Sequence, residues 1–176
     1  MIFNMILAAS LLPVIPQPRT ISEYEALGDE GYRLEISEGK PTIIAGTEVG
    51  RVWAKRTLAQ LEKDGLPEDL VISDKPKYRV RGVMLDVGRK YIPMTYLYKL
   101  VDEMSAYKLN TLHIHLNDNE IVKMPKEGWA SVDWTTKYAA FRLECETCPE
   151  LTAKDGSYTK VEFRAFMKYA KRKGVT

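Results

Sequence analysis

The feature that most constrains the fold is a pair of short strand-like segments, the apolar run at residues 83–85 and residues 111–116, separated by an amphipathic stretch. A continuous apolar run is typical of a strand that is covered on both faces. Apolar residues of the stretch between them recur at helical spacing, namely Leu97, Leu100, Val101 and Met104. The pattern predicts a strand, a helix and a second strand, and polar residues follow each strand. Parallel strands linked in this way are the units of α/β barrels, which build their active sites at the carboxyl ends of the strands.

A second helix and the start of a third strand are predicted further along. Thr159 and Glu162 form a capping box before an apolar helical face, and Gly174 ends that helix. Val175 and Thr176 then have the character of a strand opening. We therefore predict an α/β fold in which residues 77–176 form the first two βα units of a (β/α)8 TIM barrel.

The segment before the barrel units alternates between strand and helix signals. Residues 32–37 have a strand period of two, and residues 41–45 form the return strand of a hairpin. A helix is predicted over residues 48–64, followed by a short strand at 70–73. This β-β-α-β order predicts that residues 21–76 form a partial small α/β domain.

Composition and the N-terminus narrow the class of protein. Lys plus Arg is 26 and Asp plus Glu is 24, so the net charge of +2 gives no electrostatic reason to expect nucleic acid or a membrane surface as a partner. Residues 1–12 are apolar like the core of a signal peptide, but the first basic residue is Arg19. Three prolines predict that residues 1–20 form an extended arm, and no run approaches the ~18 apolar residues of a membrane span.

Two histidines share one face of the second predicted strand. His113 and His115 alternate along it, so their imidazoles point to the same side. Together with Asp118 they would resemble the start of a metal site in an amidohydrolase barrel. The sequence contains only these 2 histidines, which favours a packed, hydrogen-bonded pair in the barrel interior. A third interpretation is that they support a site indirectly, behind the residues that contact the ligand. We expect no metal and no cofactor.

Several other side chains could contribute to a ligand site. Arg81 and Arg89 flank the first strand, and either could bind the hydroxyls of a ligand or have a structural role. Trp129 and Trp134 could stack on a sugar, although tryptophan is more often buried.

Cys145 and Cys148 form a C-x-x-C motif that is followed by proline in a loop-like stretch. A redox dithiol usually opens a helix, and a zinc site needs a second pair of ligands. The motif therefore favours free thiols, with a local disulfide as the alternative for an exported protein.

Three blocks of the sequence resemble glycoside hydrolase family 20, the β-N-acetylhexosaminidases and lacto-N-biosidases. They read RGVMLDVGRKY from Arg81, HIHLNDNE from His113 and GSYTK from Gly156, in the order and at the spacing of the family. Residues 32–36 and 56–61 resemble the end of the small α/β domain that precedes the family's barrel. The resemblance thus implies the remnant of that domain followed by the start of the barrel.

The resemblance also implies roles for two residues. Arg81 corresponds to the arginine that binds sugar hydroxyls, and Asp118 to the aspartate that hydrogen-bonds the histidine orienting the catalytic glutamate. The family hydrolyses with retention, using the 2-acetamido group of the substrate as nucleophile. Its catalytic Asp-Glu pair follows the fourth barrel strand and has no counterpart in these 176 residues. We assign no catalytic residue.

We therefore expect a truncated family member, part of an enzyme that removes terminal N-acetylhexosamine from glycans. The chain alone is expected to be inactive, and its partners to be glycans that contain N-acetylhexosamine. The open edge of an incomplete barrel favours self-association. The parent enzyme is expected to be exported, while the compartment of this chain is left open. A metal-dependent amidohydrolase-like barrel fragment and a non-catalytic glycan-binding remnant are the alternatives.

Overall fold

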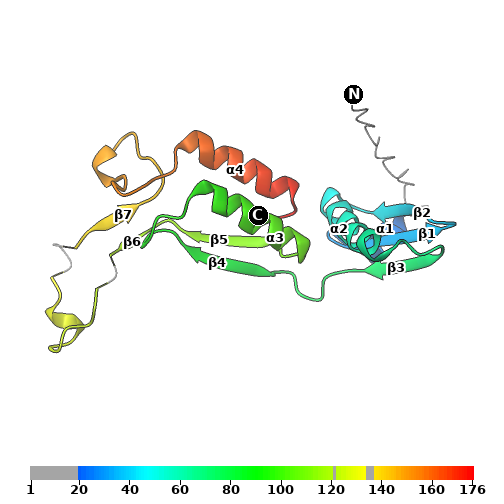
Figure 1. Cartoon of the computed structure of the whole chain (residues 1–176), viewed down its shortest axis with the longest axis horizontal. Coiled ribbons are helices and arrows are strands. Elements are labelled where there is room, and N and C mark those ends of the chain that lie inside the picture. Colours follow the sequence, from blue (N-terminus) through cyan, green and yellow to red (C-terminus); the bar gives the residue numbers. More distant parts are fainter. Residues whose placement is uncertain (1–19, 121, 134–136) are drawn as a thin grey trace, which may run out of the picture. The chain divides into compact units, whose positions relative to one another are not determined.

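The computed structural model describes residues 20–120, 122–133 and 137–176. The apolar segment and almost all of the predicted arm, residues 1–19, lie outside the described residues, as does Trp134. Contacts divide the chain into two compact units, with the division between Lys77 and Tyr78 (Figure 1).

The first unit contains an antiparallel sheet with the strand order β2-β1-β3. Its elements in chain order are α1 (Ile21–Leu27), β1 (Tyr32–Ser37), β2 (Lys40–Ala45), α2 (Glu48–Asp64) and β3 (Leu70–Asp74). The last four are the predicted β-β-α-β elements. Helix α1 is not among the predicted ones, although Thr20 and Glu23 bond each other's backbone N–H at 3.3 and 3.2 Å, as in a capping box.

Helix α2 covers the sheet of the first unit with its apolar side. Trp53 is the largest side chain in this core, and its indole N–H donates to Glu30 at 2.8 Å. The indole is therefore buried with its polar atom satisfied, as buried tryptophans require. The core consists of Tyr32, Leu34, Ile43, Ala45, Trp53, Ala54 and Leu58.

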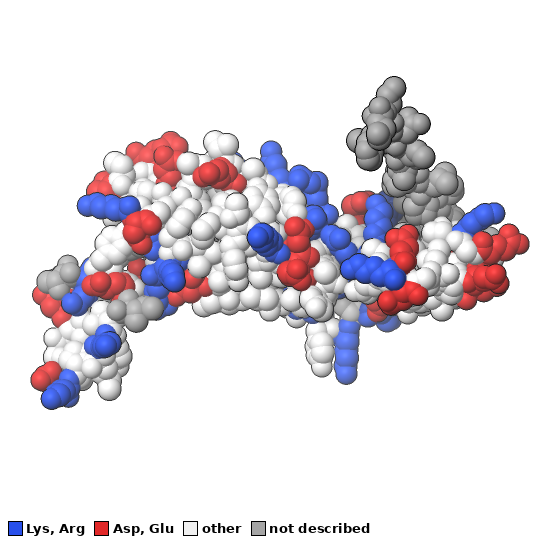
Figure 2. Space-filling view, viewed as in Figure 1, with Lys and Arg blue, Asp and Glu red and all other residues white. Residues whose placement is uncertain are grey.

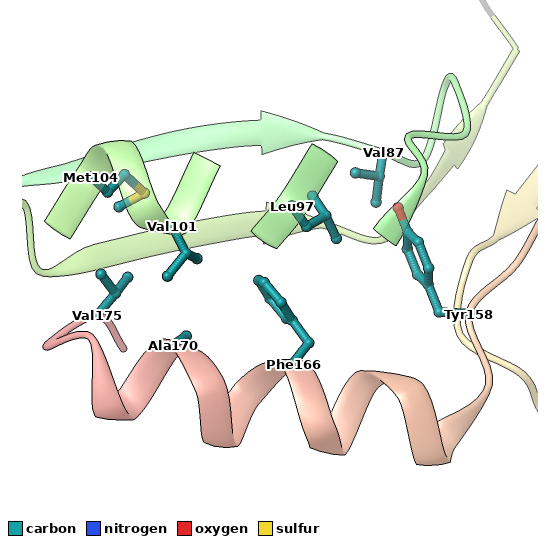
Figure 3. Packing of buried hydrophobic residues seen from close by; sticks show 8 residues of the cluster. All are labelled: Val87, Leu97, Val101, Met104, Tyr158, Phe166, Ala170 and Val175. Carbon is teal, nitrogen blue, oxygen red and sulfur yellow. The ribbon is translucent and has the colours of Figure 1, made fainter. Parts of the chain in front are cut away.

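The second unit is built on two parallel strands joined by a helix. Strand β4 (Gly82–Asp86) pairs with β5 (Thr111–His115), from Gly82 opposite Thr111 to Asp86 opposite His115. Helices α3 (Met94–Ala106) and α4 (Lys160–Arg172) lie on one side of these strands (Figure 1). Figure 3 shows the core between them, formed by Val87, Leu97, Val101, Met104, Tyr158, Phe166, Ala170 and Val175.

Thr176 already pairs with the strand before it. Its N–H donates to the Asn110 carbonyl, and the Leu112 N–H donates to the Thr176 carbonyl, both at 2.8 Å. This is the pairing expected for the opening of a third strand beside β5. With α4 as the crossover, the order of elements is that of two successive βα units.

The long segment between β5 and α4 contains more structure than the sequence predicts. Strand β6 (Asn117–Asn119) pairs antiparallel with β7 (Ala139–Phe141), so that Asp118 lies opposite Ala140. The same segment contains two short 3-10 helices, η1 (Trp129–Ser131) and η3 (Pro149–Leu151). The hairpin positions residues that follow β5 directly, and it therefore shapes the carboxyl end of the sheet.

The surface agrees with the near-neutral composition. On the face shown in Figure 2, acidic and basic side chains are interspersed, as expected for a net charge of +2. Within the described part of the chain, every helix falls short of the length or the apolar character that a membrane crossing requires.

Candidate functional site

A cluster of charged side chains lies at the carboxyl ends of β4 and β5. Asp86 is the last residue of β4 and His115 the last of β5, and the two are register partners. Because the strands are parallel, their carboxyl ends meet at the same edge, and the turns that follow them are neighbours. Arg89 lies in the turn after β4, and Asp118 lies in β6, which is separated from the end of β5 by Leu116 alone.

Arg89 joins the two carboxylates of this cluster. Its Nη1 donates to Asp86 Oδ2 at 2.6 Å, and its Nη2 donates to Asp118 Oδ2 at 2.5 Å. The Arg89 backbone N–H donates to Asp86 Oδ1 at 3.0 Å. The planar guanidinium is suited to this two-sided contact, and it remains exposed enough to meet a ligand.

Asp118 has three partners within the chain. Its Oδ2 contacts His115 Nε2 at 2.7 Å as well as Arg89, and its Oδ1 accepts the Asn119 backbone N–H at 2.7 Å. The hydrogen bond from His115, followed by the one from Asn119 and the Arg89 charge, lowers the pKa of Asp118. Asp118 is therefore an ionised acceptor at neutral pH.

The pKa of Asp86 is lowered as well. Desolvation raises it, but the hydrogen bonds from the Arg89 backbone and guanidinium outweigh that effect. The cluster thus consists of two carboxylates around one guanidinium, with an imidazole at its edge. Such a set offers both donors and acceptors to a hydroxylated ligand.

Gly88 allows the two turns to approach each other. A Cβ atom at this position would lie 2.8 Å from the carbonyl carbon of Asn117 and 2.9 Å from the Asp118 nitrogen. The N–H groups of Val87 and Gly88 both donate to the His115 carbonyl, at 3.1 and 2.9 Å. The close contact of backbone with backbone places Arg89 within reach of Asp118.

Arg81 lies at the opposite end of β4. Its backbone N–H donates to Asn110 at 2.9 Å, and its Nε and Nη1 donate to the carbonyls of Lys108 and Tyr78 at 2.9 and 2.8 Å. Five strand residues at about 3.3 Å each separate this end from the cluster by roughly 16 Å. The structure therefore does not bring Arg81 together with Asp118.

The two histidines differ in their surroundings. His115 contacts Asp118, whereas His113 is exposed on the strand face that the helices leave uncovered. In the described ranges, no group of three or more His, Cys, Asp or Glu side chains is arranged to hold a metal ion. Only His115 belongs to the charged cluster.

The remaining candidates lie away from these strand ends. Trp129 is half exposed on η1. Cys145 and Cys148 are free, partly exposed thiols, and the hydrogen bond from Thr147 lowers the pKa of the Cys145 thiol.

Arg142, which the sequence patterns did not single out, contacts the turn after β4. Its one signal is a lone charge in an otherwise apolar stretch, residues 139–143.

A parallel βα arrangement with charged groups at the carboxyl ends of its strands is the repeating unit of (β/α)8-barrel enzymes. Residues 78–176 match the glycosyl hydrolase family 20 catalytic domain. The chain belongs to this family, and its second unit is part of a TIM-barrel catalytic domain.

Named relatives support the same assignment. The chain is 35% identical over 158 residues to a beta-hexosaminidase of Akkermansia muciniphila, covering 87% of this chain and 31% of that protein. It is also 35% identical to a beta-hexosaminidase of Vibrio furnissii, covering 84% of this chain and 25% of the relative. The chain thus spans about a third or less of the length of these relatives.

A solved structure shows the same fold. The GH20 exo-beta-N-acetylglucosaminidase of Vibrio harveyi, in complex with N-acetylglucosamine, superimposes with a TM-score of 0.69 at 25% identity. The match covers 92% of this chain and 26% of that enzyme.

Proposed function

We propose that this chain is the sugar-binding portion of a glycoside hydrolase that removes terminal N-acetylhexosamine from glycans. The observation that carries the proposal is the Arg89–Asp118 pair at the carboxyl ends of β4 and β5, in a chain of this family. The guanidinium donates to sugar hydroxyls and the carboxylates accept from them. In this proposal Asp118 keeps its orienting role, and Arg89 takes the role that the resemblance implied for Arg81.

The proposed reaction is retaining and substrate-assisted, as in the family. Two adjacent Asp-Glu pairs occur in this chain at other places: Asp29-Glu30 precedes β1, and Asp102-Glu103 lies within α3. Neither lies at the carboxyl end of a barrel strand. We therefore propose that these 176 residues bind sugar without turning it over, because protonation of the leaving oxygen needs a positioned acid.

We further propose the finer domain assignment. Residues 21–76 correspond to a partial small α/β domain, and residues 77–176 to the first two βα units of the barrel. The division between Lys77 and Tyr78 supports this boundary.

The experiment that tests sugar binding compares two matched arginine variants. Titration of the chain with N-acetylglucosamine, followed by NMR chemical shifts, is expected to show a dissociation constant on the order of 1 mM, since only part of a subsite is present. Arg89→Lys is expected to weaken binding at least about tenfold, while Arg81→Lys leaves it unchanged. Equal loss in both variants, or no shift at the highest soluble sugar concentration, contradicts the proposal.

Turnover is tested separately. The purified chain is expected to release no phenol from an aryl N-acetyl-β-glucosaminide. A rate above background that disappears in Asp118→Asn would show that the chain is catalytic and that the binding-only assignment is wrong.

A further inference from the structure

Arg142 is the most deeply buried charged side chain in the described part of the second unit. It follows β7 directly, and its side chain is 1% exposed. Burial of a guanidinium is costly unless it is paired and hydrogen-bonded. Its counter-charge is Asp155. Arg142 Nη1 donates to Asp155 Oδ1 at 2.5 Å, and Nη2 donates to Asp155 Oδ2 at 3.1 Å.

The other donors of Arg142 bind backbone carbonyls on two different turns. Nε donates to the Val87 carbonyl at 2.7 Å, and Nη2 donates to the Gly88 carbonyl at 3.1 Å. Nη1 also donates to the Gly156 carbonyl at 2.9 Å. Each of the five N–H donors of a guanidinium can therefore be matched with one acceptor. Val87 and Gly88 are the residues immediately before Arg89.

The backbone of Arg142 is tied to the other strand of the site. Its N–H donates to the carbonyl of Leu116 at 2.9 Å, and its carbonyl accepts the Tyr158 N–H at 2.6 Å. Leu116 is the single residue between β5 and β6, the strand that carries Asp118. Arg142 thus contacts both segments of the site, the turn that precedes Arg89 and the residue between β5 and the strand that carries Asp118.

We propose that Arg142 is a positioning residue for the Arg89–Asp118 site, holding the turn at residues 87–88 in the conformation that presents Arg89 to Asp118. Asp155 serves as its counter-ion, and Tyr138 fixes that carboxylate with a 2.8 Å hydrogen bond. The site's role in sugar binding rests on the proposed function. The positioning itself is independent of any sugar.

Lysine cannot replace arginine in this role. An ammonium group is a point charge with three donors, and it cannot reach two carbonyls on one turn and a carboxylate on another at the same time. Arg142→Lys therefore keeps the positive charge but loses the simultaneous hydrogen bonds to the two turns. Arg164→Lys is the matched control, since Arg164 is exposed on α4.

The test measures amide hydrogen exchange in the whole chain without ligand. In Arg142→Lys, exchange at Val87, Gly88 and Asn119 is expected to become about tenfold faster or more, whereas the amides of α3 keep their protection. Arg164→Lys is expected to change neither. Unaltered protection at Gly88 in Arg142→Lys overturns the proposal, because the turn would then hold its conformation without the guanidinium.

A second variant covers the case in which Arg142→Lys does not fold. Asp155→Asn keeps Arg142 and removes only its counter-charge at a side chain that is 52% exposed. A selective rise of exchange at residues 87–88 supports the proposal. Simultaneous loss of protection in α3 shows a general core role instead and overturns it. If the turn loosens but the parent chain binds no N-acetylglucosamine, the proposed function fails while the positioning role stands.

Discussion

At the scale of single residues, sequence patterns reveal some of the residues that build the site and miss others. The charges of Asp86, Arg89 and Asp118 are visible as polar residues after apolar strands. That Gly88 must be a glycine, and that Arg142 contacts its carbonyl, follows only from distances between segments far apart in the sequence. The role of Arg81 was implied by resemblance, whereas its position at the amino end of β4 follows from the folded chain.

Replacement of Gly88 by alanine is expected to separate the two turns. The added Cβ would lie within 3.0 Å of backbone atoms of Asn117 and Asp118, which cannot move aside as a flexible side chain would. Overpacking of this kind costs typically about 1–3 kcal/mol. Urea unfolding of Gly88→Ala should show a loss of this size, and an unchanged midpoint would show that the turns have room to adjust.

The ion pair of Asp155 with Arg142 is expected to make stability depend on pH in the acid range. The hydrogen bond from Arg142 lowers the pKa of Asp155 from 3.8 to about 2. Because the folded-state pKa is depressed, the stabilisation is fully present above pH ~4 and is lost as the pH falls through about 2. The exposure of Asp155 keeps this contribution modest through solvent screening.

The measurement is the free energy of unfolding of the parent chain and of Asp155→Asn between pH 7 and pH 2. The difference between the two proteins should be constant near neutral pH and shrink below pH ~4. Asp86 and Asp118 also have lowered pKa values, but they are common to both proteins, so the difference isolates Asp155. A difference that stays constant down to pH 2 contradicts the assignment.

At the scale of elements, capping and periodicity in the sequence were sufficient to predict helices and strands whose signals lie within the element itself. Helix α4 begins where Thr159 and Glu162 predict, and both halves of the capping box are formed. Strand β1 and helix α2 likewise coincide with their predicted ranges. The β6–β7 hairpin was not predicted, because Asn-Asp-Asn has low strand propensity and its partner lies about twenty residues away.

Loss of the α4 cap is expected to destabilise the second unit. Thr159 Oγ1 accepts the Glu162 N–H at 3.1 Å, and Glu162 bonds the Thr159 N–H at 3.0 Å in return. Thr159→Ala should lower the free energy of unfolding by about 1 kcal/mol. Thr95→Ala, in the exposed first turn of α3, is the matched control and should change stability by a few tenths of that amount.

At the scale of the whole molecule, exposed apolar side chains lie on β4 of the second unit and in the segment just before it. Tyr78, Val80 and Met84 are 66%, 69% and 56% exposed, and within the described residues β4 pairs with β5 alone. An uncovered strand edge beside apolar side chains is a template for association. We expect a second copy of the chain to occupy it.

Sedimentation velocity over a range of protein concentrations tests this expectation. The parent chain should shift from monomer to larger species as concentration rises, and Met84→Lys should suppress that shift. Val161→Lys, which replaces a 75% exposed valine on α4, should leave it unchanged. A monomer at all concentrations would contradict self-association through β4.

The sequence by itself determined the α/β character, the strands and helices other than α1, β6, β7 and the two 3-10 helices, the polar residues after β4 and β5, and the resemblance to glycoside hydrolase family 20. These follow from periodicity, capping and motifs, which act over a few residues. Only the tertiary structure decided that Arg89 rather than Arg81 meets Asp118, and that Arg142 donates to the carbonyls of the turn that precedes Arg89. The reason is physical: parallel pairing sets which strand ends meet, and a buried guanidinium takes its acceptors from wherever the folded chain brings carbonyls within reach.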